Sequence, residues 1–208
     1  MWFAVVSLSV MHILSISYGP RWLFYATKPL PTILLTAIVL LNPTSLENYT
    51  VAIALGLLLS SLGDIFLMLP KERFRAGLGC FVLVQVLYSY AFALTFEHYT
   101  HWLLLLAILL LGSIIYLLLL PNLKKEKWTI AIYLIVILFM IFNAIEAWQT
   151  SEFKAMVFAG VGAIIFVLSD LVLAIDRFRA SSDFSRHVVM FTYYTAQLLI
   201  ALSAILMI

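Results

Sequence analysis

The sequence predicts an all-α membrane protein, a polytopic bundle of eight transmembrane helices. Hydrophobic residues make up 65% of the 208 residues and charged residues only 11%, whereas soluble globular proteins carry about 25% charged residues. A helix needs about 20 apolar residues to cross a bilayer, so eight spans would use roughly 160 positions and leave short connections. We therefore expect one integral membrane domain over residues 1–208, without a separate soluble domain.

The first two apolar runs are the least regular. Residues 2–17 lack the basic stretch that precedes the apolar core of a cleaved signal peptide, so we expect a retained span. Gly19-Pro20 then forms a turn sequence. The run at 22–41 is long enough to cross the bilayer, but Lys28, Pro29 and Pro31 interrupt it, which makes it the weakest of the eight.

The other six runs are continuous, and each is bounded by turn-forming or polar residues that end a membrane helix. Their lengths suit a bilayer crossing. The runs cover residues 51–69, 75–96, 102–120, 128–148, 153–175 and 187–207. The boundaries between runs are Asn42-Pro43, Pro70-Lys71, Glu97-His98, Pro121-Asn122, Gln149-Thr150 and Ser181-Ser182.

The basic residues predict the orientation of the bundle. Eleven of the 12 Lys and Arg residues fall in or near alternate connections, and only Lys154 falls on the other side. Short basic loops stay in the cytoplasm. We therefore expect both termini to lie on the non-cytoplasmic side of the membrane. The membrane itself is expected to be a bacterial inner membrane or an equivalent one. The formal net charge of +2 does not suggest a nucleic-acid partner.

Two segments four spans apart resemble each other. Gly56 precedes Asp64 by eight residues, as Gly162 precedes Asp170, and Arg-Phe-Arg-Ala follows at 73–76 and again at 177–180. Helices four spans apart have the same orientation, so the similarity suggests a parallel four-plus-four repeat. Chance similarity within a sequence of few residue types is the alternative.

Asp64, Asp170 and Glu146 are the acidic residues inside the apolar runs. A charge near the bilayer centre costs about 2.5–3.5 kcal/mol even on lenient scales, so such residues usually face a polar interior. Asp64 lies seven residues before Lys71, and Asp170 seven before Arg177, which puts both roughly 10 Å inside the cytoplasmic boundary. Two carboxyl groups in unlike surroundings can act as one acid and one base. Alternatively, they only pair and pack the bundle. Glu146 lies toward the outer end of its run, where we expect it to reach the interface.

Further polar residues are expected near the aspartates. Lys28 lies seven residues after Arg21 and could pair with a carboxylate or bind a phosphate together with helix-end amides. The others could line a cavity or join helices to each other. They are Tyr193 and Tyr194, seven and eight residues after Arg186; Gln197, four after Tyr193; and Gln85 and Tyr88, which share one helix face.

Metal and serine chemistry are not indicated. No set of His residues with carboxylates has the spacing of a zinc site, and we expect no metal and no cofactor. Ser60, Ser61 and Ser169 lie near the aspartates, but His12 stands alone on the first run, so no serine triad is expected. The single cysteine, Cys80, excludes an internal disulfide.

Four motifs together resemble the YhhN/TMEM86 family of lysoplasmalogenase-like membrane proteins. They are Lys28-Pro29-Leu30, Leu62-Gly63-Asp64 with the following helix from Phe74 to Tyr88, Phe166 to Asp170, and Tyr193 to Gln197, in the family's order over roughly residues 22–200. The resemblance implies a hydrolase that cleaves the vinyl-ether bond of lysoplasmalogens to a fatty aldehyde and glycerophosphoethanolamine or glycerophosphocholine. Relatives often carry His where this chain has Gln85.

The resemblance and the depth of the aspartates give one functional hypothesis. Asp64 and Asp170 would supply the acid and the base, in either order, on the cytoplasmic side of the membrane. Lys28, Gln85, Tyr88, Tyr193, Tyr194 and Gln197 would contact the lysophospholipid. The main alternative is a proton-coupled transporter or lipid-binding protein that uses the same aspartates. An intramembrane aspartyl protease and a purely structural membrane protein are further alternatives. The oligomeric state stays open.

Overall fold

A computed structural model describes residues 1–42, 44, 46–69 and 73–207, and within them the secondary structure is helical, without strands. The predicted boundary residues Pro43, Pro70 and Lys71 lie outside the described residues. The helices are α1 (Trp2–Ser15), α2 (Arg21–Thr27), α3 (Leu30–Leu41), α4 (Glu47–Met68), α5 (Phe74–Ala93), α6 (Trp102–Leu119), α7 (Lys127–Thr150), α8 (Met156–Phe178) and α9 (Asp183–Ile205), with the 3-10 turns η1 (Leu120–Asn122) and η2 (Lys124–Glu126) before α7.

Seven helical segments of the described chain are long and apolar enough to cross a bilayer, and the protein is an integral membrane protein. The first of the seven combines α2 and α3 over Arg21–Leu41. The other six contain α4 to α9. Helix α1 is apolar but has only 14 residues. An eighth complete span therefore stays a prediction.

The run predicted at 22–41 is divided where the sequence suggested weakness. Helix α2 ends at Thr27 and α3 begins at Leu30, with Pro31 in its first turn. Proline is tolerated in a first turn because the amide hydrogen that it lacks has no partner there. Lys28 occupies the junction, and its carbonyl oxygen accepts a hydrogen bond from the Tyr194 hydroxyl at 2.9 Å. This hydrogen bond joins the junction between α2 and α3 to α9.

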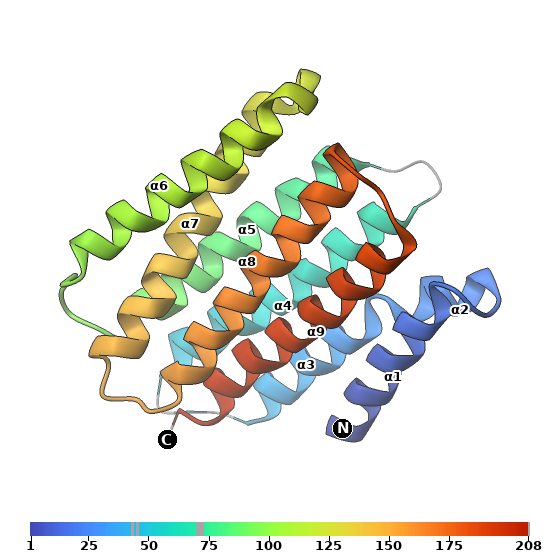
Figure 1. Cartoon of the computed structure of the whole chain (residues 1–208). Helices are drawn as coiled ribbons and strands as arrows, with labels where there is room; N and C mark the ends of the chain where they lie inside the picture. Colours follow the sequence, from blue (N-terminus) through green and yellow to red (C-terminus); the bar gives the residue numbers. More distant parts are fainter. Residues whose placement is uncertain (43, 45, 70–72, 208) are drawn as a thin grey trace.

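The helices form a bundle in which sequential neighbours pack together (Figure 1). Helix α4 packs against α5, and α8 against α9, while α3, α7 and α9 join these pairs. Helix α6 lies at the edge of the bundle and packs mainly against α7. Most of its apolar side chains face outward, including Leu103, which is 84% exposed. Such a surface suits contact with lipid chains.

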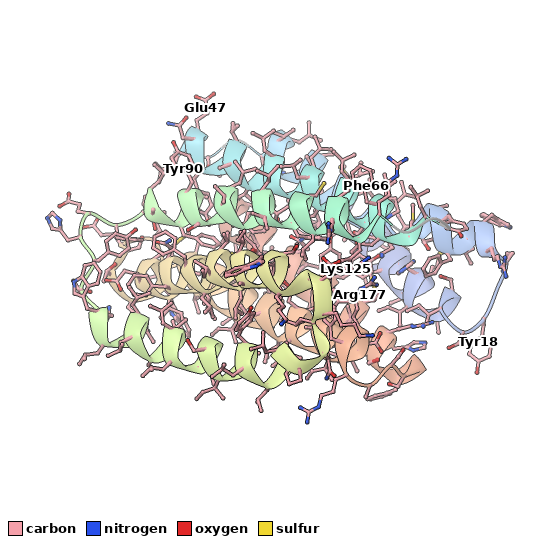
Figure 2. The ribbon with its side chains drawn as sticks, turned by 90° about the horizontal axis from the view of Figure 1, so that it is seen from above. Tyr18, Glu47, Phe66, Tyr90, Lys125 and Arg177 are labelled. Carbon is pink, nitrogen blue, oxygen red and sulfur yellow. The ribbon has the colours of Figure 1, made fainter. Side chains whose placement is uncertain are left out.

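The two ends of the bundle differ in charge. Both termini lie at one end, and the α6–α7 and α8–α9 connections lie at the other (Figure 1). In Figure 2, Lys125 and Arg177 are found toward the end that carries Tyr18, and Glu47 and Tyr90 toward the opposite end. Which end faces the cytoplasm stays a prediction, and so does the four-plus-four repeat.

Glu146 lies near the C-terminal end of α7, as expected, but its side chain is covered by the α5–α6 connection and does not extend to solvent. Its side chain is fully buried in α7. One carboxylate oxygen accepts hydrogen bonds from the Thr100 amide at 2.5 Å and the Thr100 hydroxyl at 2.6 Å, and the other lies 3.1 Å from His101 Nδ1. Asn143, one turn earlier, accepts a hydrogen bond from the Tyr99 hydroxyl. These contacts attach the α5–α6 connection to α7.

We expect Glu146→Ala to lower the stability of the fold by about 2 kcal/mol, since hydrogen bonds to charged groups contribute about 1.5–3 kcal/mol. Thermal unfolding in detergent measures the effect. Glu152→Ala, at an exposed acid of the same end of the bundle, is the matched control. Equal stability of the two variants would show that the connection is held by other contacts.

Candidate active site

A polar cavity of about 400 Å³ lies among the helices at the basic end of the bundle, and both membrane aspartates line it. Asp64 comes from α4 and Asp170 from α8. The equal depth of the two residues along parallel helices explains why they reach one cavity. The other polar side chains in the lining are His12, Lys28, Tyr133, Ser169, Asp176, Arg177, Arg186 and Tyr193.

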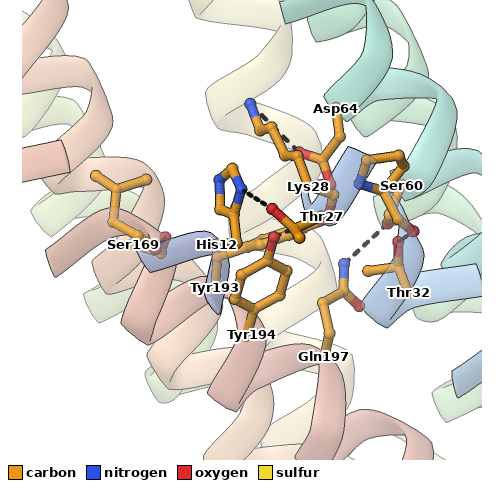
Figure 3. Close-up of polar contacts among 12 residues, drawn as sticks. His12, Thr27, Lys28, Thr32, Ser60, Asp64, Ser169, Tyr193, Tyr194 and Gln197 are labelled. Carbon is orange, nitrogen blue, oxygen red and sulfur yellow. Dashed lines mark hydrogen bonds and ion pairs between the residues drawn. The ribbon is translucent and has the colours of Figure 1, made fainter. Parts of the chain in front are cut away.

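Asp64 is held by partners from two other elements. Its Oδ1 lies 3.7 Å from Lys28 Nζ, and its Oδ2 accepts a hydrogen bond from the Tyr193 hydroxyl at 2.9 Å (Figure 3). The ring of Tyr193 is itself packed by Phe81 and Phe166, with centroids 6.0 and 6.2 Å away. Asp64 is only 3% exposed. A buried carboxylate needs such partners, because desolvation of an unpaired charge is costly.

Asp170 lies where the polar cavity meets an apolar pocket. It accepts a hydrogen bond from the Tyr133 hydroxyl of α7. The apolar pocket measures about 90 Å³ and is lined by side chains of α5, α6, α7 and α8. The cavity and the pocket share six lining residues: Phe74, Leu78, Tyr133, Asp170, Leu173 and Arg177. Asp170 is therefore part of the lining of both the polar cavity and the apolar pocket.

Lys28 and Tyr193 are the predicted binding residues that line the cavity. Tyr88 and Gln197 instead belong to a buried chain of hydrogen bonds between helices. The Tyr88 hydroxyl donates to Gln197 Oε1 at 2.6 Å, and Gln197 Nε2 donates to the Ser60 hydroxyl at 2.8 Å. This chain connects α5, α9 and α4. Tyr88 and Gln197 therefore join helices to each other, which the sequence analysis gave as the alternative to lining the cavity.

Tyr194 and Gln85 also lie outside the lining of the cavity. The Tyr194 hydroxyl donates a hydrogen bond to the Lys28 carbonyl oxygen and so helps to position Lys28 at the site. Gln85 is fully buried, and neither atom of its amide group has a hydrogen-bond partner within the described residues. Depth along a helix was predictable for these residues, but the rotation of each helix, which decides where a side chain points, was not.

His12 and Tyr133 are cavity residues that the sequence analysis missed. His12 is not alone: α1 packs against α2, α3 and α9, which brings its ring to the cavity wall. That contact depends on tertiary packing and left no signal in the sequence. Tyr133 follows Lys127 by six residues, close to the spacing of Tyr193 from Arg186, so the same depth argument could have found it.

The hydroxyl groups of the serines near the aspartates donate hydrogen bonds to backbone carbonyl oxygens. Ser169 donates to the Val189 carbonyl at 3.0 Å, and Ser60 to the Gly56 carbonyl at 2.9 Å. Within the described residues, no group of three or more His, Cys, Asp and Glu is placed to hold a metal ion. The cavity thus brings together two buried carboxyl groups with different partners, Lys28 and Tyr193 for Asp64 and Tyr133 for Asp170.

Comparison with known proteins identifies the family. The YhhN family model matches residues 23–204. The chain belongs to the YhhN family. Its relatives include lysoplasmalogenase TMEM86A of Bos taurus, 32% identical over 201 residues, which cover 91% of this chain and 81% of the relative. Lysoplasmalogenase TMEM86B of Homo sapiens is 32% identical over 185 residues, 88% of this chain and 76% of the relative.

The alignment with a bacterial relative covers nearly the whole of both chains. The uncharacterized membrane protein YhhN of Escherichia coli O157:H7 is 28% identical over 202 residues, 97% of each chain. No solved structure matches the chain significantly. The resemblance inferred from the four motifs is thus confirmed. The YhhN family match includes both aspartates, Lys28 and Tyr133, and starts after α1, which carries His12.

Proposed function

We propose that the protein is a lysoplasmalogenase, which hydrolyses the vinyl-ether bond of a 1-alkenyl lysophospholipid to a fatty aldehyde and a glycerophospho head group. The observation that carries the proposal is the position of Asp64 and Asp170 on one cavity, with Asp170 at its junction with an apolar pocket. The relatives named lysoplasmalogenase support the substrate class.

The two compartments suit the two parts of a lysolipid. The apolar pocket offers room for the stretch of chain nearest the glycerol, and the rest of the chain would lie along the exposed face of α6. Lys28, Arg177 and Arg186 line the polar cavity and supply positive charge for the phosphate. The vinyl-ether bond joins glycerol to chain, so it would lie at the junction beside Asp170.

The geometry supports a specific division of roles. Asp170 is the proton donor, because the vinyl β-carbon belongs to the chain and Asp170 borders the chain pocket. Protonation of that carbon gives an oxocarbenium ion. Asp64 is the carboxylate, held by Lys28 and Tyr193 on the polar side. It stabilises the cation and takes a proton from the water that attacks the carbon next to the ether oxygen.

The resulting hemiacetal then collapses. Asp170, now a carboxylate, accepts the proton of the hemiacetal hydroxyl, and Asp64, now protonated, donates to the departing glycerol oxygen. Aldehyde and glycerophospho head group leave, one water is consumed, and both carboxyl groups return to their starting states. The tyrosine donors, Tyr133 and Tyr193, keep the two carboxyl groups in position throughout.

The direct test uses detergent-purified protein in D₂O with a mixture of 1-alkenyl, 1-alkyl and 1-acyl lysolipids, followed by mass spectrometry. We expect aldehyde from the 1-alkenyl lipid alone, carrying one deuterium at carbon 2, because the first step adds a proton to that carbon. Binding without any product would contradict the proposal and favour a transporter or lipid-binding protein.

A larger side chain in the apolar pocket should shift the substrate preference. Ala174 lines that pocket on α8, and we expect Ala174→Phe to lower kcat/KM at least tenfold for long-chain lysoplasmalogens and much less for short-chain ones. Leu168→Phe, at an outward-facing position of the same helix, is the control. An equal loss at every chain length would place the chain elsewhere.

A further inference from the structure

His12 carries a buried nitrogen that no protein group satisfies. Its ring is fully buried at the wall of the polar cavity, and Nε2 lacks a hydrogen-bond partner within the described residues. The rings of Phe24 and Tyr194 hold it in place, with centroids 4.9 and 5.9 Å away. Almost no solvent-accessible surface is left on this nitrogen, and His12 borders the cavity, so a molecule bound in the cavity is the partner that we consider for it.

The hydrogen bonds around His12 determine which nitrogen carries the proton (Figure 3). Thr27 Oγ1 lies 2.6 Å from the Leu23 carbonyl oxygen and 3.1 Å from His12 Nδ1. The carbonyl can only accept, so the single hydroxyl proton of Thr27 points to Leu23. Thr27 can then only accept from His12, and Nδ1 is the N–H donor. A neutral ring avoids a second buried positive charge beside Lys28, which leaves Nε2 as a lone-pair acceptor.

We propose that His12 is a specificity-determining residue that accepts a hydrogen bond from the free glycerol hydroxyl of a lysolipid. The inference rests on the proposed function, which places the glycerol beside Asp64 and Lys28 in the same cavity. A 1-alkenyl lysolipid has one free hydroxyl, on the carbon next to the ether-bearing carbon. A lipid esterified at that carbon has no proton to donate and would leave Nε2 unpaired.

A site built to pair a ligand hydroxyl discriminates strongly against an analogue without it, because its own buried polar group is then left unpaired. His12 would therefore separate lysolipids from their two-chain counterparts. The residue lies before the part of the chain that the family model matches. Recognition of the hydroxyl would thus be contributed by α1, next to the aspartate site.

The test compares kcat/KM for 1-alkenyl lysolipid and for its 2-deoxy analogue, which lacks only the hydroxyl. We expect wild type to prefer the hydroxyl-bearing lipid by about a hundredfold. His12→Phe should reduce that ratio to near one by slowing only the hydroxyl-bearing lipid, and His12→Gln should restore part of it, because its amide oxygen can accept. His98→Phe, at an exposed histidine of the other end, should keep the wild-type ratio.

Thr27→Val provides a second variant that leaves the ring in place. It removes the acceptor that fixes the Nδ1 proton, and we expect it to lower the preference about tenfold. An equal loss on both lipids in His12→Phe would overturn the inference, since it would assign His12 to water or to the fold. If the proposed function itself is wrong, the wild-type protein will release no aldehyde from either lipid, which distinguishes that failure from a failure of the inference on His12. Binding of a non-cleavable 1-alkyl lysolipid against its 2-deoxy analogue would still report on His12.

Discussion

Asp170→Asn is expected to reduce aldehyde release at least about a hundredfold while the protein stays folded, because general acid catalysis contributes about 10²–10⁴ in rate. The amide has nearly the shape of the acid and can still accept the hydrogen bond from Tyr133, but it has no acidic proton to give to carbon. Single-turnover and steady-state rates on 1-alkenyl lysolipid in detergent micelles measure the loss.

Asp64→Asn should lose activity to a similar extent through the loss of the base. This variant also leaves the Lys28 ammonium, 3.7 Å away, without its partner, and removal of one member of a buried ion pair is destabilising. The double variant Asp64→Asn/Lys28→Met should recover stability without recovering activity. Glu47→Gln neutralises an exposed acid of the same helix and should behave as wild type. Full activity in either aspartate variant would refute the mechanism.

Gly56→Ala should lower stability by about 2–3 kcal/mol. A Cβ atom at this position would lie 2.2 Å from Cε1 of Tyr88. The Tyr88 ring cannot move aside freely, since its hydroxyl donates to Gln197, which in turn holds Ser60. The clash would therefore push α4 and α5 apart. Thermal unfolding in detergent, followed by tryptophan fluorescence, measures the change.

Gly79→Ala is the matched control for this prediction. A Cβ atom at Gly79 on α5 meets nothing within 4 Å, and alanine favours a helix over glycine by about 0.8–1 kcal/mol. The control should thus be neutral or slightly stabilising, opposite in sign to Gly56→Ala. The same sign for both variants would show that the contact between Gly56 and Tyr88 does not limit how closely the helices approach.

Hydropathy predicted the spans well because a bilayer requires long apolar helices whatever their neighbours. The run predicted at 128–148 is α7 at Lys127–Thr150, and the run at 51–69 is α4 at Glu47–Met68. Hydropathy does not report side-chain donors from loops, which is why the burial of Glu146 was not predicted. Its partners, Thr100 and His101, come from a connection whose path over α7 depends on packing.

Depth along a helix can be counted in a sequence, and rotation about the helix axis cannot. Counting from the basic ends brought Asp64 and Asp170 to one level, and the structure has both on one cavity. The same counting gave Tyr193 and Tyr194 almost equal depth, yet one contacts Asp64 and the other the Lys28 backbone. One residue along a helix is about 100° of rotation, enough to move a side chain out of a cavity.

The position of Asp170 between the polar cavity and the apolar pocket has a consequence for turnover. Cleavage there would cut an amphiphile into one part soluble in lipid and one soluble in water. The aldehyde could diffuse sideways past α6 into the membrane, and the glycerophosphodiester could leave through the polar cavity. Each product would partition into its own phase, so neither would have to cross the other's compartment, and their separation would oppose the reverse reaction.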